Sequence, residues 1–167
     1  DLIYHKPTVI VAVPRIFERV HSKIQETLSA GSLKQKLFLK AVDIGWKRYT
    51  GEDSLLEKLW WPLLDQLVAK KLRASFGGQL RYVLLGGAPM PAHLFKVFIG
   101  LGLTFLHGYG LTETAPVLSF NRANYNDPFS VGSPLEDIIV EIGENTELLA
   151  RGPNIMQGYW KNPVATN

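Results

Sequence analysis

The chain contains no cysteine, and its 167 residues include no long apolar run. The lack of cysteine excludes disulfides, thiolate catalysis and cysteine-based zinc sites. No apolar stretch reaches the roughly 18 residues that a membrane-spanning helix needs. The N-terminal sequence DLIYHKPTVIV also lacks the basic-then-apolar order of a signal peptide. These absences fit a reducing compartment, and we expect a cytoplasmic protein.

The chain also lacks a large excess of either positive or negative charge. Lys and Arg number 18 against 15 Asp and Glu, an excess of only +3. Because nucleic-acid binders cluster their basic residues on one face, and no such run occurs, we expect no nucleic-acid partner. Hydrophobic residues make up 46% of the chain, which is ordinary for a globular protein with one core.

The two ends of the sequence suggest a piece of a longer protein. The chain begins with Asp1, a strand-like run follows almost at once, and the last residues, NPVATN, include no capping element. A complete domain with a processed N-terminus is the alternative.

The first half is predicted to be rich in helices. TVIVAV (residues 8–13) is typical of a buried strand, and Pro14 suits the first turn of a helix that ends near Gly31. Apolar residues at helical spacing predict further helices over 33–49 and 54–75. Ser54 and Glu57 form a capping box at the start of the last of these.

Two adjacent tryptophans, Trp60 and Trp61, lie in that last helix. Packing in a core or hairpin is the main interpretation of this pair. The apolar, lysine-flanked segment also leaves peripheral membrane contact open.

The second half alternates strand and helix. LRYVLLGGAPMP (80–91) and GLTFLHGYGLTE (102–113) each predict a strand and a glycine turn, and AHLFKVFIG (92–100) predicts a helix between them. The order β-α-β favours parallel neighbours. We expect an α/β fold: a parallel-sheet portion over 1–128 with a helical insertion at about 30–78. A small, incomplete β-rich region begins at 129 and runs to 167.

The loops after the two strands are predicted to share one rim, because ligands bind at the carboxyl ends of parallel strands. GGAP (86–89) and HGYGLTE (107–113) are rich in glycine, and both are expected to lead into helix N-termini that attract anions. Tyr109 offers a flat face for a base, Thr112 a hydroxyl for a phosphate, and Glu113 an oxygen ligand for Mg²⁺. On the pattern alone, the glycines could be only turn formers, Tyr109 a packing ring, Thr112 an N-cap, and Glu113 a dipole partner.

Several motifs resemble those of the adenylate-forming enzymes: acyl-CoA synthetases, luciferases and peptide-synthetase adenylation domains. YGLTETAP (109–116) is similar to the adenine- and magnesium-binding signature of that superfamily. YVLLGGAPMP (82–91), VGSPL (131–135) and ELLARGPNIMQGYWKNPVAT (147–166) resemble its other motifs and occur in the family's order. KPTVIVAVPRIFERVHSKI (6–24) and the helical stretch at about 30–78 are most similar to long-chain fatty acid–CoA ligases.

This resemblance implies roles for residues of both loops. Tyr109 is expected to stack on adenine, Thr112 to contact the α-phosphate, and Glu113 to bind Mg²⁺, with Thr112 and Glu113 as the catalytic pair. His107 and Gly108 are expected near the join of nucleotide and acyl carboxylate. The implied nucleotide-contacting set is Gly86, Gly87, Ala88, Pro89, Gly108, Tyr109, Gly110 and Thr112. Thr146 stands where the family usually has glycine, and we expect it to alter only a turn.

The implied activity is that of an AMP-forming acid–thiol ligase. A fatty carboxylate attacks the α-phosphate of ATP, and CoA then displaces AMP from the acyl-adenylate. The implied partners are thus small molecules: fatty acid, ATP and CoA. The family's phosphate loop, ribose-binding aspartate and catalytic lysine are not in this sequence, so we expect the isolated chain to be inactive.

Two alternatives stay open. One is a fatty acyl-AMP ligase that passes its acyl group to a carrier protein. The other is a non-catalytic binding or assembly module, in which exposed apolar surface drives homodimer formation.

Overall fold

The computed structural model describes residues 2–166 and divides into two compact units, residues 1–105 and 106–167. The division predicted near residue 128 stays a prediction. No helix within residues 2–166 has the length and apolar character needed to cross a membrane.

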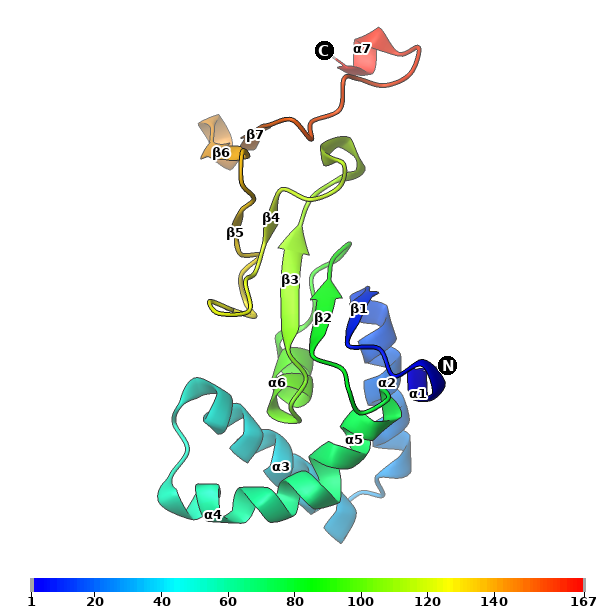
Figure 1. The fold of residues 1–167 in the computed structure, drawn as a ribbon, viewed down its shortest axis with the longest axis vertical. Coiled ribbons are helices and arrows are strands. Elements are labelled where there is room, and N and C mark those ends of the chain that lie inside the picture. Colours follow the sequence, from blue (N-terminus) through cyan, green and yellow to red (C-terminus); the bar gives the residue numbers. More distant parts are fainter. Residues whose placement is uncertain (1, 167) are drawn as a thin grey trace. The chain divides into compact units, whose positions relative to one another are not determined.

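The first unit is built on two parallel strands. After the short helix α1 (Leu2–His5), β1 (Val9–Ala12) pairs with β2 (Tyr82–Leu85) in the register Val9↔Tyr82 to Ala12↔Leu85 (Figure 1). The Val83 N–H donates to the Thr104 carbonyl at 2.8 Å, immediately before β3 (Phe105–Tyr109) begins. The mixed α/β class with a parallel strand pair is therefore confirmed.

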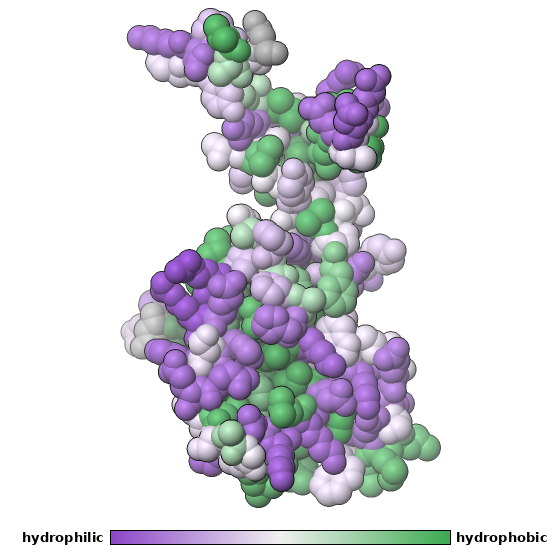
Figure 2. Space-filling model, turned by 180° about the vertical axis from the view of Figure 1, so that it is seen from behind, coloured by the Kyte–Doolittle hydropathy of each residue, from purple (hydrophilic) through white to green (hydrophobic). Residues whose placement is uncertain are grey.

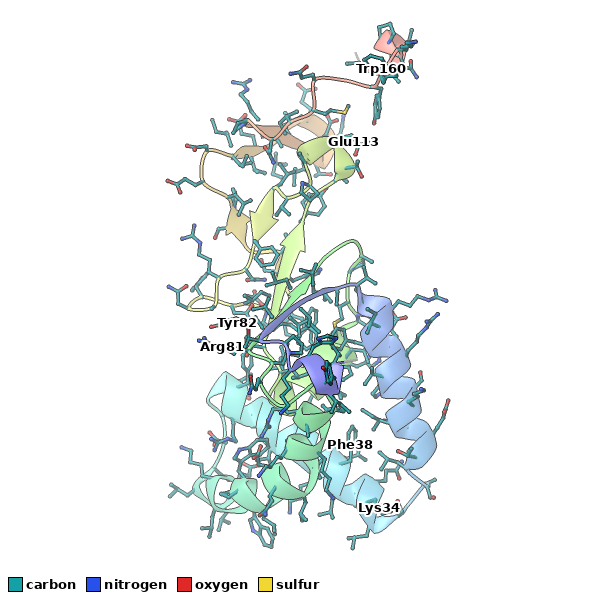
Figure 3. The ribbon with its side chains drawn as sticks, turned by 45° about the vertical axis from the view of Figure 1, so that its right-hand side comes forward. Lys34, Phe38, Arg81, Tyr82, Glu113 and Trp160 are labelled. Atoms are coloured by element: carbon teal, nitrogen blue, oxygen red, sulfur yellow. The ribbon has the colours of Figure 1, made fainter. Side chains whose placement is uncertain are left out.

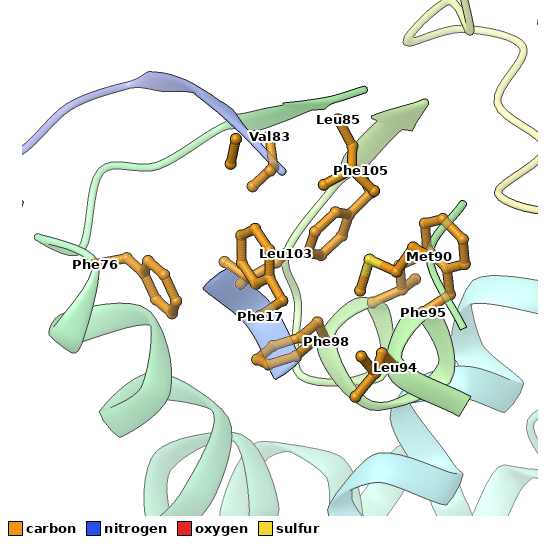
Figure 4. Packing of buried hydrophobic residues seen from close by; sticks show 12 residues of the cluster. Phe17, Phe76, Val83, Leu85, Met90, Leu94, Phe95, Phe98, Leu103 and Phe105 are labelled. Carbon is orange, nitrogen blue, oxygen red and sulfur yellow. The ribbon is translucent and has the colours of Figure 1, made fainter. Parts of the chain in front are cut away.

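Two helices cover the buried face of this strand pair. Helix α2 (Pro14–Thr27) begins at the predicted proline, and α6 (Ala92–Gly100) has the predicted bounds. The Phe17 ring, completely buried, lies 4.7 Å from the ring of Phe105 and 5.2 Å from that of Phe98, centroid to centroid. Figure 4 shows these rings at the centre of an apolar cluster that includes Phe76, Leu94 and Phe95. Burial of these side chains is the main stabilising contribution to the unit.

The segment predicted as a helical insertion consists mainly of helices. Helix α3 (Leu33–Thr50) is followed by α4 (Leu55–Leu64), a π-helical segment (Asp65–Ala69) and α5 (Lys70–Ser75). The capping box at Ser54 is present, with both reciprocal hydrogen bonds to Glu57. Helices α3 and α6 can approach closely because Gly45 has no side chain. A Cβ at this position would overlap the carbonyl group of Gly100.

The second unit consists of short antiparallel strands. β3 continues into it and pairs with β4 (Ser119–Phe120), which pairs with β5 (Ser133–Pro134). A separate hairpin joins β6 (Ile139–Ile142) to β7 (Leu148–Arg151) through a 3₁₀ turn (Glu144–Thr146). The short helix α7 (Pro163–Thr166) ends the described chain. The strand-like segments predicted beyond residue 128 are therefore present.

Three local predictions need correction. The 8–13 segment is a strand, but the Val11 side chain is 83% exposed, because only one face of β1 packs against the core. Residues 107–109 are strand rather than turn, because β4 supplies their hydrogen-bonding partner. Of the two tryptophans, Trp61 packs against the insertion's apolar cluster, whereas Trp60 is exposed.

Candidate functional site

The end of β3 carries Tyr109 to the surface of the second unit. Gly108 pairs with Phe120 and Tyr109 with Ser119, and the Leu118 N–H donates to the Tyr109 carbonyl at 2.8 Å. The Tyr109 side chain is about one-third exposed, whereas His107 is buried. The strand therefore presents a partly exposed tyrosine ring at its carboxyl end, whereas His107, two residues earlier, is covered.

The turn after β3 is held by Thr114. Its buried hydroxyl accepts from the Leu111 N–H at 2.9 Å and donates to the Leu111 carbonyl at 3.0 Å. A 3₁₀ turn (Thr112–Thr114) follows, and the Ala115 N–H donates to the Thr112 carbonyl at 3.3 Å. The Thr112 side chain is exposed. A ligand can therefore reach the Thr112 hydroxyl, while Thr114 fixes the backbone that carries it.

Gly110 allows this turn to close tightly. A Cβ at this position would lie 2.7 Å from the Val117 Cα and 2.8 Å from the Pro116 carbonyl carbon. Carbon atoms at these distances would clash sterically, so the two ends of the turn can meet only if residue 110 has no side chain. The glycine that the sequence pattern marked as a turn former therefore also determines where Thr112 and Glu113 lie.

The Glu113 carboxylate has a defined partner. The Tyr159 hydroxyl donates to Glu113 Oε1 at 2.6 Å, and the Met156 N–H donates to the Glu113 carbonyl at 2.9 Å. The hydrogen bond from Tyr159, followed by one from the Glu113 backbone amide, holds the pKa of the Glu113 carboxyl below its usual value. The same contact raises the pKa of the Tyr159 phenol. Glu113 is therefore an ionised carboxylate in a set position (Figure 3).

The C-terminal segment is fastened to the same turn by Asn154. Its Nδ2 donates to the Thr114 carbonyl at 2.7 Å and to the Val117 carbonyl at 2.9 Å. Sequence reasoning assigned no role to Asn154 or Tyr159, although both lie in the quoted GPNIMQGYW segment. Their partners are about 40 residues away in the chain, and no local pattern indicates such a contact.

A cavity of about 290 Å³ opens beside these groups within the second unit. Its lining includes Tyr109, Glu113 and Thr114 together with Ile155, Met156 and Gly158. It therefore combines an aromatic ring, a carboxylate and apolar side chains, which is the usual composition of a small-molecule site.

The first glycine loop belongs to the first unit. The Gly86 N–H donates to the Ala12 carbonyl at 3.4 Å and so extends the strand pair. Gly87 has a left-handed backbone (φ +80°), and Gly87, Ala88 and Pro89 are exposed. These three residues are open to a ligand before α6 begins at Ala92. The predicted shared rim would require loops from both units, and it stays a prediction.

Metal binding would depend on Glu113. Within residues 2–166, no three His, Asp or Glu side chains come close enough to hold a metal together. An ionised carboxylate with substrate phosphates is nevertheless a common ligand set for Mg²⁺. The Glu113 carboxylate fits that role, since its contact with Tyr159 keeps it charged and oriented.

The sequence profile of the family described as AMP-binding enzyme matches residues 1–160. The chain is 37% identical over 169 residues to a long-chain-fatty-acid–CoA ligase of Mycobacterium bovis. It is 31% identical over 207 residues to a chloroplastic long-chain-fatty-acid–acyl-carrier-protein ligase of Arabidopsis thaliana. Each alignment includes 99% of this chain, which spans 28% of the length of each of these curated relatives.

The fold also matches solved structures. A benzoate CoA ligase of Burkholderia xenovorans superimposes with a TM-score of 0.62, covering 99% of this chain and 27% of that one. Sequence identity over this superposition is 18%, so the match concerns the fold alone.

Proposed function

Because this chain belongs to the AMP-binding enzyme family, we propose that it forms part of a long-chain fatty acid–CoA ligase. In such an enzyme, a fatty carboxylate attacks the α-phosphate of ATP, releasing pyrophosphate and forming an acyl-adenylate. The CoA thiol then attacks the acyl carbon and displaces AMP. The chain would contribute one wall of the nucleotide site.

The observation that carries this proposal is the Glu113 carboxylate, held charged by Tyr159 beside an exposed threonine and a tyrosine ring. Two anions must meet in the first step, so the α-phosphate needs compensating charge and hydrogen-bond donors. Thr112 would donate its hydroxyl proton to an α-phosphate oxygen. Glu113 would hold Mg²⁺, which when bound neutralises the charge that develops on the phosphates.

Tyr109 would stack on the adenine, and the Gly87–Pro89 loop of the first unit is a separate candidate for backbone contacts with a nucleotide. The Tyr109 ring is partly exposed at the end of a strand, so one face is available for stacking on a base. Gly87 has no side chain, and Ala88 and Pro89 after it are exposed, so a flat ring can approach backbone atoms there. These contacts would orient the nucleotide without taking part in bond breaking.

The choice of CoA as acceptor rests on the 37% identity to the mycobacterial CoA ligase. The 31% identity to the Arabidopsis ligase favours acyl carrier protein as the second candidate. A product assay on the full gene product would separate the two. Given ATP, Mg²⁺ and a long-chain fatty acid, we expect acyl-CoA when CoA is added and no acyl transfer to acyl carrier protein. Transfer to the carrier protein alone would contradict the CoA assignment.

A second experiment tests the role of Glu113. Glu113→Gln in the full gene product is expected to lower ATP–pyrophosphate exchange strongly, and added Mg²⁺ should restore part of it. Tyr159→Phe should give a smaller loss, with the pH profile of exchange shifted upward because the Glu113 pKa rises. Glu144→Gln, an exposed glutamate of the β6–β7 turn, is the matched control and should leave exchange unchanged. Full exchange by Glu113→Gln at limiting Mg²⁺ would refute the proposed role.

A further inference from the structure

Helix α4 presents an apolar face to solvent. Its exposed apolar residues follow the spacing of one helical face and continue into the π-helical segment: Leu55, Leu56, Leu59, Trp60, Leu63 and Leu67. We call these six residues the α4 apolar face. The Leu55 and Leu59 side chains are 84% and 77% exposed, respectively. The inward side of the same helix is already occupied, because Leu64 is buried and Trp61 packs beside it.

The helical segment that carries this face has an excess of lysine. Residues 33–75 contain nine Lys and Arg side chains and five Asp and Glu side chains, so this segment alone has an excess of four positive charges. Four of the five acidic side chains are already paired with Lys or Arg, and the pairs include Glu57 with Lys47 and Asp65 with Arg73. Among residues 2–166, five lysines of this segment take part in no ion pair: Lys34, Lys36, Lys40, Lys70 and Lys71.

One of these lysines lies against a tryptophan ring of the α4 apolar face. The Lys40 ammonium lies 5.3 Å from the centroid of the Trp60 ring. An aromatic ring with a lysine beside it is suited to the boundary between lipid headgroups and acyl chains. Figure 2 shows apolar residues along the lower edge of this unit, with hydrophilic residues around them.

An apolar cavity of about 520 Å³ adjoins the face. Leu67 belongs to both, and the cavity extends between α2, α3 and α5 with Lys34 and Lys71 among its lining residues. Figure 3 shows Lys34 at one end of α3 and Phe38 one turn along, on the inner side of that helix. An apolar hollow with ammonium groups in its lining suits the acyl chain and anionic headgroup of a lipid.

The composition of the face favours a bilayer over a protein partner. The centre of a protein interface is depleted in lysine, because a buried ammonium loses its hydration. At a membrane surface, lysines extend to the headgroups while leucine and tryptophan enter the acyl boundary. Each lysine near an anionic surface also strengthens binding.

We propose that the α4 apolar face docks the first unit onto the surface of an anionic lipid bilayer. Helix α4 would lie in the plane of the interface, with its leucines and Trp60 among the acyl chains and the lysines of the same segment on the headgroups. This inference goes beyond the catalytic assignment and does not depend on it.

Vesicle flotation of the full gene product tests the proposal. The protein should float with vesicles of phosphatidylglycerol and phosphatidylcholine and much less with phosphatidylcholine alone. Leu55→Ser with Leu59→Ser should lower the partition coefficient at least tenfold, and Lys70→Gln about fivefold. The control is Ile142→Ser with Val164→Ser, which removes two similarly exposed apolar residues from the second unit. It should float like the wild type.

Tryptophan fluorescence gives an independent readout. Trp60 and Trp160 are both exposed, and each has a lysine near its ring. Quenching by brominated lipid should fall in Trp60→Phe and persist in Trp160→Phe. Failure of the wild type to bind anionic vesicles would overturn the proposal, as would equal flotation of the Leu55/Leu59 variant. A stable soluble dimer that depends on Leu59 would overturn it in favour of a second copy of the chain.

Discussion

Replacing Gly110 by alanine should damage the proposed site without removing any of its functional groups. The added Cβ would lie 2.7 Å from the Val117 Cα, and ordinary contact begins near 3.4 Å. The backbone on one side of the turn must therefore move away by about 0.7 Å to relieve the contact with the Val117 Cα. Relieving the contact with the Pro116 carbonyl group needs a larger movement. Thr112 and Glu113 lie in the chain between these two contact points, so any separation of the ends displaces both.

The expected effect on rate follows from this displacement. A misplacement of about 1 Å at a reacting centre can cost on the order of a hundredfold in rate. We therefore expect Gly110→Ala to lower kcat/KM for ATP–pyrophosphate exchange in the full gene product by roughly that factor. Gly51→Ala is the control: Gly51 has a left-handed backbone (φ +77°) at the end of α3, with no atom within 4 Å of a new Cβ. It should lower the unfolding temperature slightly and leave exchange intact. If Gly110→Ala exchanges pyrophosphate at the wild-type rate, the turn does not position the reacting groups.

Two further predictions concern stability. Phe17→Ala should lower the free energy of unfolding by about 3–5 kcal/mol, because it leaves a cavity at the centre of the first unit's core. Ile16→Ala, on the exposed side of the same helix, should change the free energy of unfolding by less than about 0.5 kcal/mol. Urea denaturation measures both values, and equal effects would contradict the described core. The Lys47 ammonium, with the Ser54 cap, lowers the pKa of Glu57 to about 2, so the stabilisation is present above pH 4.5 and is lost as pH falls from 4.5 towards 2. The unfolding temperatures of wild type and Glu57→Gln should therefore converge over that range. A difference between them that stays constant as the pH falls would contradict this role of Glu57.

The sequence was sufficient to predict an element where the contacts that determine it join residues near each other in the chain. Pro14 begins a helix because its ring fixes φ and it needs no N–H partner there. Ser54 and Glu57 are three residues apart and satisfy each other's backbone donors, so the capping box could be predicted directly. The helix over residues 92–100 was predicted from its own sequence with the bounds that the structure shows.

Predictions failed where the outcome depends on a distant partner. Residues 107–109 have the glycine content of a turn, yet they form a strand because they pair with β4. The Asn121 N–H donates to the His107 carbonyl at 2.9 Å, and the Leu118 N–H donates to the Tyr109 carbonyl at 2.8 Å. The helix predicted as continuous over 54–75 contains a π-helical segment at Asp65–Ala69, shortly after Pro62, which has no N–H to donate. The β-branched run at 8–13 predicted burial on both faces, but Val11 is exposed because none of residues 2–105 covers that face of β1.

The sequence by itself determined the α/β class and the helices of residues 33–75, and it predicted Tyr109, Thr112 and Glu113 as site groups. The class and the helices follow from residue spacing and turn chemistry, which are local, whereas the roles of the three site groups follow from the family resemblance and stay predictions. Only the tertiary structure decided that Tyr159 hydrogen-bonds Glu113 and that Asn154 fastens the turn, since each contact joins residues some 40 positions apart. It also decided which side of α4 is buried. An apolar periodicity shows that a helix has an apolar face, but only its packing partners show which leucines remain in contact with solvent.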